Sequence, residues 1–292
     1  MIFLQVLEIV APVFLLALAG YVWRRSGRPF DIAFVSRLVM IIAVPSLLFS
    51  VLSKIEVDPR AFRDLALASL GFYAALTVVS WGAIRISGLD RRAFLAPFIF
   101  GNTGNVGLPV SLFAFGEQGL AYAMVVFAVM AALSFTIGVA LVAGRSSPFE
   151  AFKQPIFYGA ILGIVFAAYD LPVPDVIDKT LSLAGQVAIP VMLITLGVAV
   201  AQLDVRDFGR ALSMSLAKVA VCALAAVAVI GAFDLPYVAA GALALQAIMP
   251  VAVTNYLLAT RYDADPGSVA GLVVISTLVS VAVVPLTLAL LL

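Results

Sequence analysis

The 292-residue chain is 64% hydrophobic and only 11% charged, with a formal net charge of +1. A soluble domain is typically about 45–50% apolar and about 25% charged, so this chain has more apolar surface than it can bury against itself. The near-zero net charge argues against a nucleic-acid partner. The chain has no histidine, the commonest metal ligand, and we predict neither a metal site nor a cofactor.

Apolar runs long enough to cross the bilayer as helices recur along the whole chain. They are too long for the strands of a porin-type barrel, which need only about ten alternating residues. The sequence therefore predicts an all-α integral membrane protein in contact with lipid. Charged residues, proline and glycine divide it into ten predicted spans: 2–23, 31–53, 63–86, 92–115, 119–143, 154–170, 175–200, 208–233, 236–260 and 266–291.

The charges of the short loops predict the orientation of these spans. Most of the loop Lys and Arg residues follow odd-numbered spans; Lys54, Arg60 and Arg63, after the second span, are the main exception. Cytoplasmic loops carry an excess of basic residues, so both termini are expected outside.

The spans also predict an internal duplication. Five lie in residues 1–143 and five in 155–292, joined by a short cytoplasmic linker at 144–154. A repeat with an odd number of spans, duplicated in tandem, inserts with opposite topology and gives an inverted pair.

Four prolines support the repeat. Pro45 and Pro190, in spans two and seven, are separated by nearly the same number of residues as Pro109 and Pro250, in spans four and nine. The alternative is that membrane helices commonly carry proline without any repeat.

Spans four and nine are interrupted by polar residues, glycine and proline. Residues 100–113 read "FGNTGNVGLPVSLF", and residues 245–258 read "LQAIMPVAVTNYLL". An unpaired peptide group costs several kcal/mol in hydrocarbon, so a broken helix persists only where protein or a water-filled cavity satisfies it. Interrupted segments at matching positions of two inverted halves indicate a transporter binding site.

Two half-helices that begin at mid-membrane would present their N-termini, which attract anions. A small organic anion is therefore the predicted substrate, and the alternative is that the polar side chains only bond neighbouring helices. The candidate binding residues are Asn102, Thr103, Asn105, Pro109, Met249, Pro250, Val251, Thr254 and Asn255.

Two ionisable residues inside predicted spans are further candidates. Lys218 lies about 15 Å into span eight at 1.5 Å per residue, too deep to reach the surface easily. We expect its ammonium to contact carbonyl ends of the broken helices or the substrate, as a fixed cation in place of bound Na⁺; a purely structural clamp is the alternative. Glu8, in span one, is a candidate for carrying a coupling proton, or it lines a wet vestibule.

The segments "GNTGNVGLPVSLFAFG" (101–116), "RLVMIIAVPSLLF" (37–49) and "ALQAIMPVAVTNYLLATRYDADPGSVAGLVVISTLVSVAVVPL" (244–286) resemble the auxin efflux carrier family, the PIN-like transporters. The resemblance covers essentially the whole chain, and its segments are similar to those of bacterial members. This implies that the protein lies in the bacterial cytoplasmic membrane. It implies ten helices, with a scaffold of spans 1, 2, 6 and 7 and a moving transport domain of spans 3–5 and 8–10. The one protein partner considered is a second copy of the chain, in a homodimer formed through the scaffold.

The resemblance also implies that substrate binds where spans four and nine cross. The family's crossing asparagine and proline correspond to Asn102 and Pro250. Gly101 replaces the plant proteins' proline, so the local kink is expected to come from glycine flexibility. Val251 stands where a polar residue often follows, and that loss of a polar contact argues against auxin itself as the substrate. Small carboxylates such as malate or malonate are the suspected cargo of bacterial members, and auxin-like acids are the other class.

Three further classes compete with an elevator-type carrier of organic anions. A sodium-coupled symporter of the bile-acid type needs oxygen ligands for Na⁺, and few carboxylates lie near the crossing. A non-transporting sensor is disfavoured by the lack of a long loop or signalling segment, and a channel would show flux beyond carrier rates and no counterflow. An enzyme is the least expected class, because no Ser/Lys or Asp/Asp constellation falls at membrane depth.

Overall fold

The computed structural model describes residues 2–54, 58–144 and 153–292, and every regular element within these ranges is a helix. The first half contains α1 (Ile2–Arg25), α2 (Ile32–Leu38), η1 (Val39–Ala43), α3 (Val44–Leu52), α4 (Pro59–Ser87), α5 (Arg91–Ile99), η2 (Thr103–Gly107), α6 (Leu108–Leu133), η3 (Ser134–Gly138) and α7 (Val139–Ala143), where η marks a π-helical turn. The second half contains α8 (Pro155–Ala168), α9 (Asp175–Gln186), α10 (Ala188–Gln202), α11 (Phe208–Ala232), α12 (Tyr237–Ala247), α13 (Val253–Arg261) and α14 (Pro266–Leu291).

Several helices are long and apolar enough to cross a membrane. The described residues contain seven such candidates: Leu4–Arg25, Ile32–Leu52, Pro59–Ser87, Thr103–Ala143, Asp175–Gln202, Phe208–Ala232 and Pro266–Leu291. Two more helices, α8 and α12, are apolar but shorter. The predicted all-helical fold is confirmed over the described residues, and these apolar helices agree with a membrane protein, whereas the count of ten spans and the inverted repeat stay predictions.

Aspartates at the loop ends explain where several helices begin. Each accepts a hydrogen bond from a backbone N–H of the first turn, which otherwise has no intrahelical partner. The aspartates that cap α2, α4, α5, α11 and α14 are Asp31, Asp58, Asp90, Asp207 and Asp265.

Glycine 116 divides α6 into two helical pieces. Gly116 has φ 65° and ψ −158°, a conformation that a residue with a side chain rarely adopts. The chain therefore changes direction between the predicted spans 92–115 and 119–143, although no loop separates them.

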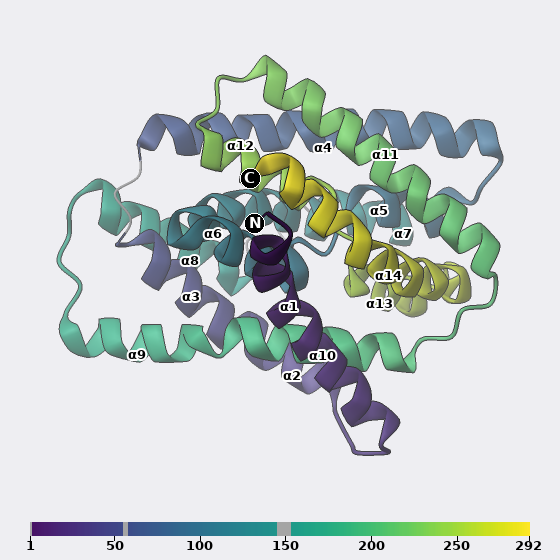
Figure 1. The fold of residues 1–292 in the computed structure, drawn as a ribbon, viewed down its shortest axis with the longest axis horizontal. Helices are drawn as coiled ribbons and strands as arrows, with labels where there is room; N and C mark the ends of the chain where they lie inside the picture. The colour runs from purple at the N-terminus through teal and green to yellow at the C-terminus, as the bar shows by residue number, and fades with distance from the viewer. Residues whose placement is uncertain (1, 55–57, 145–152) are drawn as a thin grey trace.

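The helices pack in two groups. In the first group α1 packs on α10, and α3 packs on both α8 and α9. In the second group α6 packs on α12, α11 packs on α14, and α4 contacts α5, α6 and α11. In the view of Figure 1, α4 and the α9–α10 pair run along opposite edges of the molecule, and α5, α6 and α13 lie between them.

The helices α1 and α10 touch through their backbones. A Cβ atom on Gly197 would lie 1.7 Å from the carbonyl oxygen of Ala17, and one on Gly20 would lie 2.0 Å from that of Ile194. Small residues allow this close approach, which is typical of helix packing in membranes. At Gly20 and Gly197, the contact between α1 and α10 therefore has no room for a larger side chain.

Candidate functional site

The two interrupted segments meet in the interior and satisfy each other's backbone. The helix α5 ends at Ile99 and α12 ends at Ala247, and the extended residues that follow form an isolated antiparallel bridge between Gly101 and Val251. The Asn102 N–H donates to the Pro250 carbonyl at 2.6 Å, and a second backbone bond joins the segments on the other side of the bridge. The peptide groups freed by the broken helices are thus paired across the crossing, as burial away from water requires.

Side chains from two other helices reinforce the crossing. The Ser276 hydroxyl, on α14, accepts a hydrogen bond from the Val251 N–H at 2.9 Å. Asn255 Nδ2 donates to the Phe100 carbonyl, also at 2.9 Å. Our sequence analysis did not single out Ser276, because a serine within an apolar helix carries no signal of what it faces.

The buried lysine of α11 lies at the end of α5. Lys218 is 3% exposed, and its Nζ donates to the Phe98 carbonyl oxygen at 3.2 Å and lies 3.6 Å from the Cys222 Sγ. The C-terminal end of a helix carries a partial negative charge, so an ammonium group there is favourable. The structure therefore places Lys218 against the C-terminal end of one broken helix, at a residue that shortly precedes the bridge at Gly101.

The Asn102 carboxamide is oriented with its donor free. Its Oδ1 accepts the Asn105 N–H at 3.3 Å, while its Nδ2 has no hydrogen-bond partner among the described residues. Asn102 is 5% exposed, so this unpaired donor is buried. A buried donor without an acceptor costs about 1–3 kcal/mol, and a ligand oxygen placed there would remove that cost.

A cavity of about 130 Å³ opens beside the crossing. Of the predicted binding residues, Asn102, Asn105 and Thr254 line it. The structure places the other predicted residues within the crossing segments or the helices they begin, outside the wall of this cavity: Thr103, Pro109, Met249, Pro250, Val251 and Asn255.

Other helices contribute much of the wall, and our sequence analysis did not identify them as part of the site. Met40, Phe127, Met130 and Met192 line the cavity from η1, α6 and α10, and Leu257 lines it from α13. Apolar side chains in apolar helices give no sequence signal for a cavity. Glu8 is exposed on α1 and does not line this cavity.

Two helices begin at the wall of the cavity. The helix that starts as η2 and continues into α6 places Gly104 there, and α13 places Val253 and Thr254 there. The first N–H groups of a helix have no intrahelical acceptor, and each helix start carries roughly half a positive charge. The arrangement is suited to binding an anion.

A second cavity, of about 410 Å³, lies farther along the same helices. Its wall includes residues 47–54 of α3 and the turn after it and residues 186–190 of α9–α10, whereas the first cavity takes residues 32–40 and 192–199. Along residues 32–54 the chain passes the first cavity and then the second, whereas along residues 186–199 it passes the second cavity and then the first. The two cavities therefore lie toward opposite ends of the packed helices.

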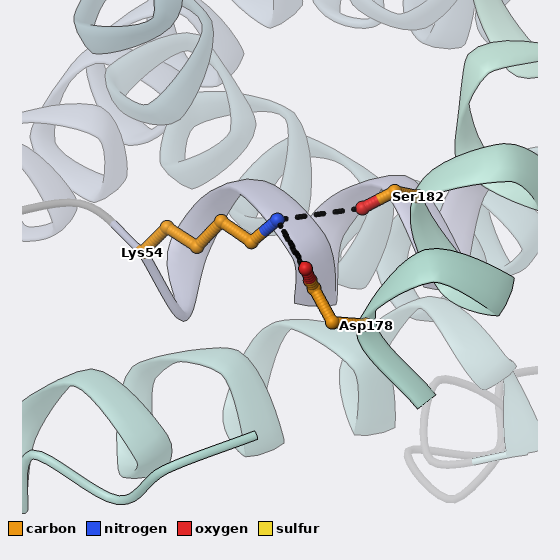
Figure 2. Close-up of polar contacts among 3 residues, drawn as sticks. All are labelled: Lys54, Asp178 and Ser182. Carbon is orange, nitrogen blue, oxygen red and sulfur yellow. Dashed lines mark hydrogen bonds and ion pairs between the residues drawn. The ribbon is translucent and has the colours of Figure 1, made fainter. Parts of the chain in front are cut away.

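An ion pair lies at the second cavity (Figure 2). Lys54 Nζ lies 2.7 Å from an Asp178 carboxylate oxygen and 3.4 Å from the Ser182 hydroxyl. Glu117, which follows the bend at Gly116, lines the same cavity from α6. The Lys54 and Asp178 side chains are 51% and 29% exposed, so their attraction is screened by solvent.

Comparison with known proteins gives the chain a family. Two stretches, residues 5–151 and 144–288, match the family described as "Membrane transport protein". An "Uncharacterized transporter" of Methanocaldococcus jannaschii is 25% identical over 96% of this chain and 97% of its own length. Another, of Methanothermobacter thermautotrophicus, is 26% identical over 98% of each chain.

A third relative, from Rhizobium meliloti, is named "Putative malonate transporter" and is 24% identical over 96% of this chain and 94% of its own length. The family match spans nearly the whole sequence, and all three relatives are named as transporters. The chain therefore belongs to this family of membrane transport proteins, the auxin efflux carrier-like transporters.

Proposed function

We propose that this protein carries small organic anions, with a carboxylate group, across the bacterial cytoplasmic membrane by elevator-type alternating access. The observation that supports this most directly is the free Nδ2 donor of Asn102, buried at a cavity where two helices begin. The malonate in the name of the Rhizobium meliloti relative is a carboxylate and agrees with that substrate class.

The proposed architecture is ten spans in two inverted halves, residues 1–143 and 155–292, with both termini outside. The two stretches that match the family meet at residues 144–151, within the predicted linker. The scaffold would comprise α1, α2–α3, α8 and α9–α10, and the transport domain α4–α7 and α11–α14. The two packed groups of helices support this division.

The two cavities give the proposed motion its direction. The first lies where α2, η1 and α10 of the scaffold face α6 of the transport domain, and the second lies where α3 and α9–α10 face α6. The crossing lines the first cavity and is absent from the wall of the second. A slide of the transport domain along the scaffold would move the crossing from the first cavity toward the second, which exchanges the side from which the substrate enters.

Replacing Asn102 by alanine is expected to reduce solute counterflow of a transported carboxylate in proteoliposomes at least about tenfold. A hydrogen bond to a charged group contributes about 1.5–3 kcal/mol, and 1.4 kcal/mol corresponds to a factor of ten. Ser280→Ala is the matched control, because Ser280 is a buried α14 hydroxyl that does not line the cavity. Equal loss in both variants, or full counterflow in Asn102→Ala, would place the anion elsewhere.

Replacing Lys54 by glutamine is expected to slow anion transport several-fold at low ionic strength and much less at high salt. A cation in a vestibule raises the local concentration of anions, and salt screens that effect. The free energy of unfolding should change by only about 0–1 kcal/mol, because the Lys54–Asp178 pair is exposed.

The control is Lys179→Gln on α9, the helix that carries Asp178. Lys179 pairs with Asp175 at 3.8 Å, is largely exposed and does not line the second cavity. A flux difference that does not depend on salt, or an equal effect in both variants, would argue against the second cavity as an access route.

A further inference from the structure

A small cleft lies where three helices begin. The first turns of α5, α11 and α14 come together there, and Phe94, Arg210 and Gly267 of these turns line a cleft of about 30 Å³. In the view of Figure 1 the starts of α11 and α14 lie together at the right edge. No residue of this cleft lines the crossing cavity or the second cavity. The cleft is therefore separate from the proposed transport route.

Two arginine side chains are held on the walls of the cleft. The Arg206 guanidinium lies against the Gly267 backbone, because a Cβ atom built on Gly267 would be 2.9 Å from the Arg206 Cζ. The Arg210 guanidinium stacks on the Phe94 ring, with its Cζ 4.9 Å from the ring centroid. A stacked guanidinium keeps the N–H donors on its edge available, and their fork matches two oxygens of a phosphate group.

The positive charge of the cleft is only partly compensated. Among the residues that the structure describes, no carboxylate forms an ion pair with either cleft arginine. Asp207 also lines the cleft, and its Oδ1 accepts the Arg210 backbone N–H at 3.0 Å as the cap of α11. Two guanidinium groups and one carboxylate leave a single positive charge, which suits one monoanionic group.

The helix starts themselves add little to this charge. Aspartates cap all three helices, so first-turn N–H groups are already bonded to a carboxylate at each start. The donors left for an anion are the side chains of Arg206 and Arg210.

The cleft lies at the level of the lipid headgroups. The helices α11 and α14 are both long and apolar enough to cross a membrane, and both begin at the cleft. The loop charges predict that this end is cytoplasmic. Basic pockets between membrane helices on the cytoplasmic side bind anionic lipid headgroups. Phe208 and Leu216, both exposed on α11, offer apolar surface for acyl chains next to the cleft.

We propose that this cleft binds the phosphodiester group of an anionic phospholipid, between Arg206 and Arg210, with the acyl chains along the exposed face of α11. The cleft is too small for a whole lipid or a nucleotide, so the phosphate enters and the rest of the molecule stays outside. A zwitterionic lipid brings a cation of its own, which the two arginines repel, so the site selects lipids with a net negative charge.

The site also bears on the proposed motion. Arg206 belongs to the connection between α10 and α11, which joins the proposed scaffold to the proposed transport domain. A lipid bound there would hold this connection at the leaflet surface. This consequence rests on the proposed function, whereas the binding of the lipid does not.

Native mass spectrometry of the purified full chain in detergent tests the proposal. The protein is titrated with phosphatidylglycerol or with phosphatidylcholine of the same acyl chains. We expect one phosphatidylglycerol to bind at least about tenfold more tightly than phosphatidylcholine. The double variant Arg206→Gln/Arg210→Gln is expected to lose at least about tenfold in affinity for phosphatidylglycerol and to bind phosphatidylcholine as before.

Arg85→Gln is the matched control. Arg85 stacks on Trp81 near the end of α4, shortly before α5 begins, and does not line the cleft. Its affinity for phosphatidylglycerol should equal that of the unsubstituted protein. An equal loss in Arg85→Gln and in the double variant, or no loss in the double variant, would overturn the proposal, because the attraction would then be general to the basic surface.

Inorganic phosphate distinguishes a lipid from a free anion. It is expected to compete with phosphatidylglycerol only weakly, since it lacks acyl chains that pack against α11. Phosphate that binds through the same two arginines as tightly as the lipid would show that the cleft is a site for a soluble anion. Each of these measurements is made without transport, so failure of the lipid site leaves the proposed function standing.

Discussion

Lys218→Gln is expected to lose at least about tenfold in transport while the protein remains folded. The glutamine amide can still donate to the Phe98 carbonyl, so the hydrogen bond that holds the end of α5 has a replacement. The fixed positive charge near the crossing is lost, and with it the attraction of that charge for an anion bound there. Under the proposed role of Lys218 as a fixed cation, charge and not packing sets the transport rate.

Lys218→Ala separates the two roles. Alanine removes both the charge and the hydrogen bond and leaves the buried carbonyl unpaired, which costs about 1–3 kcal/mol. We expect a lower unfolding temperature in detergent for the alanine variant than for the glutamine variant, and a similar loss of counterflow in both. Normal, Na⁺-independent counterflow by Lys218→Gln would show that the lysine is only a structural clamp.

Flux should also be measured with Na⁺ replaced by another cation. A requirement for Na⁺ that arises in Lys218→Gln would indicate that the ammonium group normally occupies a cation position. A requirement for Na⁺ in the unsubstituted protein would instead favour the sodium-coupled symporter class.

Gly197→Ala is expected to disrupt the packing of α1 on α10. The added Cβ atom would lie 1.7 Å from the Ala17 carbonyl oxygen and 2.8 Å from the Tyr21 backbone nitrogen, and neither backbone can move without separating the helices. Overpacking typically costs about 1–3 kcal/mol, and a clash with backbone atoms, which cannot rotate away as a side chain can, belongs at or above the upper end. Thermal unfolding in detergent and the monodispersity of the purified protein would measure the effect.

Gly231→Ala on α11 is the matched control. Nothing lies within 4 Å of a Cβ atom built at Gly231, so alanine should be neutral, or stabilising by up to about 1 kcal/mol through its higher helix propensity. Equal stability of the two alanine variants would mean that α1 and α10 are farther apart than the structure shows.

The interrupted segments show how far sequence reasoning reaches into the site. Glycine, proline and amides at residues 101–109 and 246–255 predicted that two spans are broken, because each of these residues weakens a helix or carries polar groups into hydrocarbon. The backbone pairing of Gly101 with Val251, and the hydrogen bond that leaves the Asn102 donor free, depend on how the two segments are placed in space. Residue identity does not contain that placement.

The sequence alone determined the solvent of this protein and the character of its elements: apolar runs of membrane length dictate helices in lipid, and polar breaks mark the two interrupted segments. Only the tertiary structure decided what faces the crossing. Met40, Phe127, Met130 and Met192 belong to helices whose apolar residues can equally face lipid, a neighbouring helix or a cavity. Lipid tails are as apolar as these side chains, so hydrophobicity does not distinguish the three forms of contact in a membrane, and packing between helices selects among them.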